Sequence, residues 1–279
     1  MTPPPDTGAP AARPGDQPTL ADDLAVALTL AHEADLIAID RYRAQDLDVQ
    51  LKPDRTQVTD ADTRVERTIR EHLAQARPAD AVLGEELGGG DAHAPGRQWI
   101  VDPIDGTSNF VRGVPIWGLL LALAIDGVPQ VGVVSAPALG RRWWAATGHG
   151  AWVEESGGPA RRIRVSAVSE LADATLSYNS IQQWDGAGRL DQLVALSRRV
   201  GRTRAFGDLW SYMLLAEGSI DIAGEFDLKP WDLAALIPIV REAGGTVTNV
   251  DGGERLDAGS VIATNGALHD QVLQSLPDL

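Results

Sequence analysis

Seven carboxylates stand in four short motifs near the ends of predicted strands or in turns. They are Asp60 and Asp62 in VTDAD, Glu85 and Glu86 in GEE, Asp102 and Asp105 in DPIDGTSN, and Asp232 in PWD. All offer oxygen, and no cluster of histidine or cysteine accompanies them, so the set suits Mg²⁺ better than zinc or copper. Any one of these acids alone is more often a solvated charge: Asp60 and Asp62 can cap a helix, and Glu86 can face solvent.

The segment WIVDPIDGTSNF is harder to explain as ordinary surface. Pro103 stiffens the chain just after an apolar strand, so that Asp102 and Asp105 can converge on one side of a tight turn. Gly106 lets a ligand approach the main chain closely. The residues after it can begin a short helix whose free N–H groups face an anion. Carboxylates for metal ions and amides for phosphate then share one segment, which is the combination that metal-assisted phosphoryl chemistry requires.

The elements around the first motifs predict an α+β first half. Apolar spacing predicts helices from residue 20 to about 43 and over 60–76, the first opened by a capping box of Thr19 and Asp22. Strands are predicted in LDVQL, QWIVD and the hairpin WGLLLALAIDGVPQVGVVSAP, whose Asp-Gly pair is a strong turn signal. The segment AVLGEELGGG predicts a short strand followed by a mobile glycine-rich loop. We therefore expect two helices packed against an antiparallel sheet.

The second half of the chain alternates between strand and helix patterns, which predicts an α/β arrangement. One helix is expected in WDLAALIPIVREAGG, with a kink at Pro238. Residues 1–18 are rich in proline, alanine and glycine and predict a disordered tail. We expect a metal-binding α+β domain over 19–165 and a smaller α/β domain over 166–279 that completes the active site.

The overall composition restricts the partners. The net charge of −15 argues against a nucleic-acid binder, and an anionic substrate would require bound cations to reverse the local field. The chain has no cysteine, which fits the reducing cytoplasm. The longest apolar run, from Trp117 to Ile125, is far too short to span a bilayer, so we expect no membrane partner.

GEE, WIVDPIDGTSNF and PWD, in this order, resemble the signature motifs of the inositol monophosphatase family of Mg²⁺-dependent, lithium-sensitive phosphatases. VTDAD resembles a weaker motif, VREAGGTVTNVDG resembles the stretch after the last one, and the match runs from about residue 20. The resemblance implies a layered αβαβα sugar-phosphatase fold, two to three Mg²⁺ ions per active site, a phosphate monoester substrate and a homodimer.

The resemblance also implies a metal-ligand set. Glu85 would bind the first metal ion and, partly through water, a third one. Asp102 would bridge the first and second ions, and the carbonyl of Ile104 would complete the first. Asp105 and Asp232 would hold the second ion.

The remaining site residues follow in the same way. The amides of Gly106, Thr107 and Ser108 would bind phosphate. Thr107 and Asp62 would polarise the attacking water, with Glu85 taking part in catalysis through its metal ion. Lys52 stands where family members often keep a lysine near the metal site, and we group it with the substrate-binding residues.

The choice of phosphate ester depends on another stretch of the chain. Asp208 after Gly207, with Tyr212 soon after, resembles the histidinol-phosphate phosphatase branch, and Glu225 matches a family position that often contacts substrate. Histidinol phosphate carries an ammonium and an imidazole, with which Asp208 and Glu225 can pair. Asp208 can equally cap the helix that follows it, and the two roles are compatible.

Two alternatives remain at this point. One is an inositol-1-monophosphatase or a broad-specificity sugar monophosphatase, since the shared motifs set the reaction but not the alcohol. The other, from a different class, is an inactive relative that serves as a binding or regulatory subunit. That alternative predicts broken metal-ligand motifs, whereas all the expected ligands are present.

Overall fold

A computed structural model describes residues 18–53 and 55–276, so most of the predicted tail at 1–18 lies outside the described residues. The helices are α1 (Leu20–Arg41), α2 (Asp60–Ala76), α3 (Thr107–Arg112), α4 (Ile181–Gly186), α5 (Leu190–Ser197), α6 (Asp208–Ala216), α7 (Pro230–Leu233), α8 (Leu236–Glu242) and α9 (His269–Leu273). The strands are β1 (Val49–Leu51), β2 (Gln57–Thr59), β3 (Ala81–Gly84), β4 (Arg97–Asp105), β5 (Gly118–Ile125), β6 (Val128–Ala136), β7 (Arg141–Ala146), β8 (Ala151–Glu155), β9 (Arg161–Arg162), β10 (Thr175–Ser177), β11 (Arg202–Arg204), β12 (Ile222–Phe226), β13 (Thr246–Thr248) and β14 (Ser260–Thr264).

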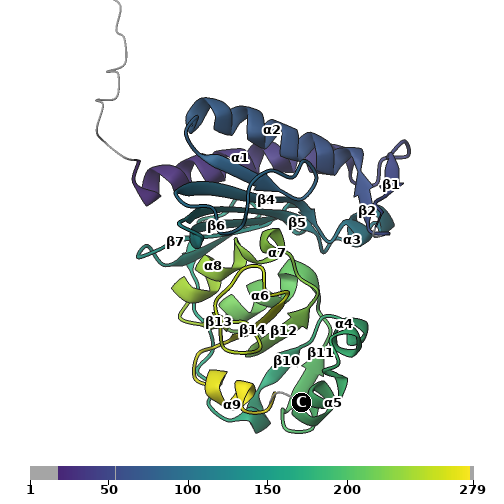
Figure 1. The fold of residues 1–279 in the computed structure, drawn as a ribbon, viewed down its shortest axis with the longest axis vertical. Helices are drawn as coiled ribbons and strands as arrows, with labels where there is room; N and C mark the ends of the chain where they lie inside the picture. The colour runs from purple at the N-terminus through teal and green to yellow at the C-terminus, as the bar shows by residue number, and fades with distance from the viewer. Residues whose placement is uncertain (1–17, 54, 277–279) are drawn as a thin grey trace, which may run out of the picture.

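The elements stack in five alternating layers of helix and sheet (Figure 1). Helices α1 and α2 form the outer layer over the first sheet, and α6, α7 and α8 lie between the two sheets. Helices α4, α5 and α9 cover the far side of the second sheet. Each sheet therefore buries both faces, and the expected αβαβα architecture is confirmed.

The first sheet holds seven strands in the order β3-β4-β5-β6-β7-β8-β9. Every neighbouring pair is antiparallel except β3 and β4, which run parallel, so the expected antiparallel sheet has one parallel edge. Asp126 and Gly127 join β5 to β6 with φ angles of 52° and 77°, as the predicted turn requires. The central strands β4, β5 and β6 are almost fully buried and provide a rigid support for the residues at their ends.

Capping boxes begin both outer helices. Thr19 and Asp22 bond reciprocally at the start of α1, and Thr59 and Asp62 do the same at the start of α2. The buried face of α2 includes Val65, Ile69 and Leu73, which pack into the cluster between the outer helices and the first sheet. This packing fixes where the first turn of α2 lies against the sheet.

The second sheet has the order β11-β10-β12-β14-β13, parallel over β11, β10 and β12 and antiparallel beyond. Along the chain, the first strand of this sheet is β10, which begins at Thr175, whereas the last strand of the first sheet, β9, ends at Arg162. One apolar cluster contains side chains from both sheets and from the middle helices. The division into domains at residue 165 stays a prediction.

One predicted helix is two in the structure. The pattern WDLAALIPIVREAGG folds as α7 and α8, separated at Ala234 and Ala235, so the expected kink at Pro238 was wrong in its position. Pro238 is the third residue of α8. At this position a main-chain N–H has no acceptor within the helix, so proline removes no helical hydrogen bond. The short helix α4 was not predicted from the sequence. Among residues 18–53 and 55–276, no helix is long and apolar enough to cross a membrane.

Candidate active site

The end of β4 changes register at the point where the two aspartates stand. The pairing of β4 with β5 shifts between Asp102 and Asp105, because Pro103 interrupts the ladder. Oδ1 of Asp102 accepts a hydrogen bond of 3.0 Å from the N–H of Ile104. Asp102 and Ile104 are buried, whereas Asp105 is half-buried at the strand end. The buried strand thus holds both carboxylates on a stiff local turn.

The chain then enters α3 through Gly106, which has a φ of 81°. A Cβ at this position would lie 3.0 Å from the carbonyl oxygen of Ile116, so the close approach as well as the dihedral angle favours glycine. No side chain caps α3. Within the described chain, nothing accepts a hydrogen bond from the main-chain N–H of Thr107 or Ser108. These amides therefore have no acceptor among the described residues, and their binding of phosphate stays a prediction.

Thr107 and Asp62 come together from two different layers. The hydroxyl of Thr107 lies 3.0 Å from the carbonyl oxygen of Ile104 and 3.4 Å from Oδ1 of Asp62. The other oxygen of Asp62 is held by Thr59, with 2.8 Å to its N–H and 2.6 Å to its hydroxyl. Asp62 therefore caps α2 and also faces Thr107. Burial raises its pKa to about 6, against the opposing effect of the Thr59 hydrogen bonds.

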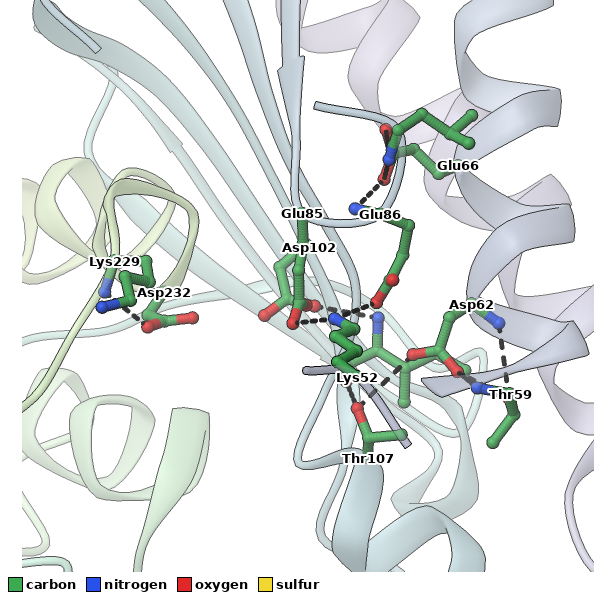
Figure 2. A network of polar contacts seen from close by, with 12 residues as sticks. Lys52, Thr59, Asp62, Glu66, Glu85, Glu86, Asp102, Thr107, Lys229 and Asp232 are labelled. Atoms are coloured by element: carbon green, nitrogen blue, oxygen red, sulfur yellow. Dashed lines mark hydrogen bonds and ion pairs between the residues drawn. The ribbon is translucent and has the colours of Figure 1, made fainter. Parts of the chain in front are cut away.

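Glu85 and Glu86 share Lys52. The ammonium of Lys52 lies 2.7 Å from a carboxylate oxygen of each glutamate (Figure 2). The side chain of Glu86 is only 6% exposed, so the alternative that it faces solvent was wrong. Burial raises the pKa of Glu86 to about 7. Burial acts to lower the pKa of Lys52, but its hydrogen bonds to both glutamates raise that pKa above its ordinary value. Lys52 is thus an internal counter-ion for this pair.

Glu66 supports the loop that carries the GEE motif, and sequence reasoning missed it. Its fully buried carboxylate accepts hydrogen bonds from the N–H groups of Glu86 and Leu87, the first at 2.7 Å, and pairs with Arg70. A Cβ on Gly84 would come within 2.0 Å of Glu66 Oε1. The available signal was its spacing: Glu66 lies four residues after Asp62, on the same face of α2.

Asp232 belongs to α7 and lies apart from Glu85 and Asp102 (Figure 2), but it lines one cavity together with Asp105. Its Oδ2 accepts a 2.7 Å hydrogen bond from the N–H of Lys229, which closes the first turn of α7. Burial raises the pKa of Asp232 to about 7, and the charge of Glu85 acts in the same direction. In the described part of the chain, no three histidine, aspartate or glutamate side chains are grouped closely enough to hold one metal ion.

The electrostatics nevertheless fit a divalent cation. Burial is the main cause that raises the pKa of Asp102 well above its usual range. The negative charges of Glu85, Asp105 and Asp232 raise this pKa further. Burial also raises the pKa of Asp105 well above its usual range, and the negative charges of Asp208 and Asp232 raise it further. Clustered buried carboxylates with only oxygen donors are stabilised by a hard cation such as Mg²⁺.

The comparison with known proteins agrees with this chemistry. The sequence profile of the inositol monophosphatase family matches residues 20–279. The chain belongs to the inositol monophosphatase family.

Three relatives place the chain within the inositol monophosphatase family more closely. A histidinol-phosphatase of Mycobacterium tuberculosis is 54% identical, over 91% of this chain and 98% of the relative. A histidinol-phosphatase of Streptomyces coelicolor is 51% identical, over 92% of this chain and 97% of the relative. A solved structure of an inositol monophosphatase from Zymomonas mobilis is 31% identical, over 93% of this chain and 99% of that one, with a TM-score of 0.80.

This member of the inositol monophosphatase family has a cavity of about 120 Å³ beside the metal-ligand candidates. It is lined by Asp105, Asn179, Gln183, Asp208, Leu209, Tyr212, Glu225, Asp227, Leu228, Asp232 and Leu236. A larger cavity of about 540 Å³ lies between α1 and α2, but no carboxylate lines it. The smaller cavity contains the predicted site residues Asp105, Asp208, Glu225 and Asp232 and is therefore the candidate substrate site.

Glu225 is a buried residue that lines this cavity. Its two oxygens accept hydrogen bonds from the hydroxyl of Tyr212, at 2.5 Å, and from the side-chain amide of Asn179. Burial raises the pKa of Glu225 to about 8, although the Tyr212 hydrogen bond acts in the opposite direction. Glu225 is thus held in one orientation by two donors that the sequence analysis did not assign to it.

Asp208 does not cap α6, so that alternative was wrong. No side chain caps this helix through Gly207 or Asp208. Oδ2 of Asp208 instead accepts a 2.8 Å hydrogen bond from the side-chain amide of Asn109. The carboxylate that accepts from the first turn of α6 is Asp105, from the N–H of Leu209. Burial raises the pKa of Asp208.

Proposed function

We propose that this protein is a Mg²⁺-dependent histidinol-phosphatase, which hydrolyses L-histidinol phosphate to L-histidinol and phosphate in histidine biosynthesis. The observation that carries the proposal is the lining of the cavity: it includes Asp208 and Glu225 and no cationic side chain. A substrate with an ammonium and an imidazole gains from this environment, whereas a neutral polyol gains less. The two histidinol-phosphatase relatives support the same activity.

The metal ligands proposed for this chain are the carboxylates of Glu85, Asp102, Asp105 and Asp232 and the carbonyl of Ile104, holding two to three Mg²⁺ ions. Bound Mg²⁺ lowers the pKa of a coordinated water and offsets the charge of the phosphate. The ammonium of Lys52 contacts Glu85 and would share this carboxylate with the metal ion. Asp232, on α7, lines the same cavity as Asp105 and would complete the set.

The chain's own residues orient the reaction. The free amides of Thr107 and Ser108, together with that of Gly106, hold the phosphate oxygens. The hydroxyl of Thr107 stands between Asp62 and the carbonyl of Ile104 and positions the attacking water. With a pKa of about 6, Asp62 is ionised at neutral pH and accepts the proton that the water loses.

A substrate panel at fixed Mg²⁺ tests the proposal. We expect kcat/KM for histidinol phosphate to exceed that for inositol 1-phosphate by about a hundredfold, as loss of paired charges in a buried site costs roughly 3 kcal/mol. The second candidate function, an inositol-1-monophosphatase or broad sugar monophosphatase, is favoured by the similarity to the Zymomonas mobilis structure. A clear preference for the inositol ester would establish that second candidate instead.

We further propose a homodimer that acts in the cytoplasm without nucleic-acid or membrane partners. The dimer rests on the resemblance to the family, and the compartment rests on the absence of cysteine from the chain. Light scattering of the purified protein measures the oligomeric state directly. A single species of 29.6 kDa at working concentrations would exclude the dimer.

A further inference from the structure

Asn109, in the first turn of α3, joins two segments that meet at the cavity. Its side-chain amide donates two hydrogen bonds of 2.8 Å, one to the carbonyl oxygen of Ile116 and one to Oδ2 of Asp208. The Ile116 bond fixes the plane of the amide against the loop before β5. The second hydrogen of the same group therefore has a fixed direction, and it points at Asp208, 99 residues further along the chain.

The main chain at Asp208 needs this support. Gly207 and Asp208 both have positive φ angles, 79° and 47°, a combination that an ordinary side chain adopts at a cost. A Cβ on Gly207 would also lie 2.9 Å from Oδ1 of Asn179. The turn presents the Asp208 carboxylate to the cavity, close to Asp105, whose negative charge would otherwise drive it outward.

Only one carboxylate oxygen of Asp208 accepts a hydrogen bond from the described residues. Oδ2 accepts from Asn109, and across residues 18–53 and 55–276 no group donates a hydrogen bond to Oδ1. Both oxygens of Glu225, by contrast, already accept from Tyr212 and Asn179. Asp208 thus keeps one oxygen open to a cationic ligand. Asp105 and Asp232 line the same cavity and also have only Oδ2 hydrogen-bonded within the described residues, but both are proposed metal ligands.

We infer that Asn109 is a positioning residue for substrate specificity, which holds Asp208 so that its open oxygen meets the cationic part of the substrate. The inference rests on the proposed function. Helix α3 then orients both ends of one molecule: its first amides hold the phosphate, and Asn109 acts on the ammonium or imidazole through Asp208. A carboxylate fixed before binding loses less conformational entropy on binding, which increases affinity.

The test compares Asn109→Ala, Asp208→Asn and the double variant as full-length, Mg²⁺-loaded enzymes. We expect N109A to raise KM for histidinol phosphate about tenfold, with a much smaller change in kcat. Competitive inhibition by histidinol should weaken by a similar factor, while inhibition by inorganic phosphate stays within about twofold. In the D208N background, adding N109A should change KM by less than about twofold, because Asn109 then has no carboxylate to orient.

Asn249→Ala is the matched control. Asn249 is buried and also donates two hydrogen bonds through its amide, both of 3.0 Å, to the carbonyl oxygens of Arg255 and Ser260. The Asn249→Ala variant should have a lower free energy of unfolding than the wild type and an unchanged KM for histidinol phosphate. If N109A fails to fold, Asn109→Ser provides the same comparison with a smaller loss of packing.

The outcomes separate this inference from the proposed function. If the wild-type enzyme does not hydrolyse histidinol phosphate, the proposed function fails. If the wild type does hydrolyse it but N109A weakens phosphate and histidinol inhibition equally, Asn109 supports α3 as a whole and the inference is overturned. An unchanged KM in N109A, or an additive effect in the double variant, overturns it as well.

Discussion

The main-chain N–H of Leu209 donates a 2.6 Å hydrogen bond to Oδ2 of Asp105. The bond joins the end of β4 to the first turn of α6, across 104 residues of sequence. A carboxylate proposed to hold a metal ion is thereby attached to the helix that carries Asp208. The metal site and the specificity residue share one support, so displacement of α6 moves both.

Replacing Asp105 by asparagine should abolish most of the activity. The amide oxygen can still accept the Leu209 bond, but it lacks the charge that a divalent cation requires, and we expect turnover at saturating Mg²⁺ to fall roughly a hundredfold or more. Asp227→Asn is the control, because Asp227 lines the same cavity with a side chain that is 78% exposed. Unchanged turnover in D105N would overturn the metal mechanism.

Added Mg²⁺ should stabilise the fold. Its binding removes the repulsion among Asp102, Asp105 and Asp232, and Mg²⁺ at a hundred times its dissociation constant raises the free energy of unfolding by about 2.7 kcal/mol. Urea titrations with excess EDTA or with Mg²⁺ measure the difference. The same titrations of Asp102→Asn should show a much smaller effect of Mg²⁺. Equal stabilisation of both proteins would place the Mg²⁺ site elsewhere.

Glu66→Ala should lower both stability and metal affinity. The change leaves Arg70 without its buried partner and frees the loop that carries Glu85, so we expect a loss of about 3–5 kcal/mol in unfolding free energy. The Mg²⁺ concentration for half-maximal activity should rise by roughly 10- to 100-fold, as for other residues that orient metal ligands. Glu71→Ala, on an exposed position of the same helix, should change neither. Normal Mg²⁺ dependence in a folded E66A protein would contradict the supporting role.

The metal-free protein should become less stable as the pH rises from about 5 to 8. Burial raises the pKa of Glu225 from 4.5 to about 8, so the folded state binds more protons than the unfolded state within this window. The contribution is fully present below pH 4.5 and is lost as the pH rises through 8, with a slope of up to about 1.4 kcal/mol per pH unit. Unfolding free energies in EDTA measure the slope. Glu225→Gln should make the slope shallower but should not remove it, because Glu86 and Asp232 also have raised pKa values of about 7. If wild type and E225Q show the same slope, carboxylates other than Glu225 cause the pH dependence.

Much of the fold was predictable because its signals are local. The Thr19–Asp22 capping box, the periodicity of α2 and the Asp126-Gly127 turn each lie within a few residues, and all three are confirmed. The layered architecture followed from the family resemblance and is also confirmed. The break between α7 and α8 was misplaced because helix spacing continues through Ala234 and Ala235, and tertiary packing decides where the two helices part.

The sequence by itself determined the chemistry of the site: hard oxygen ligands, a glycine turn and free amides, since residue types and short spacings are enough to specify them. The roles of the predicted ligands stay predictions until metal is bound. Only the tertiary structure decided that Asp105 accepts from Leu209, that Lys52 pairs with Glu85 and Glu86, and that Asn109 reaches Asp208. Periodicity tells which face of an element is buried but not how one layer is placed against the next. These contacts join layers, so they depend on packing that no local pattern records.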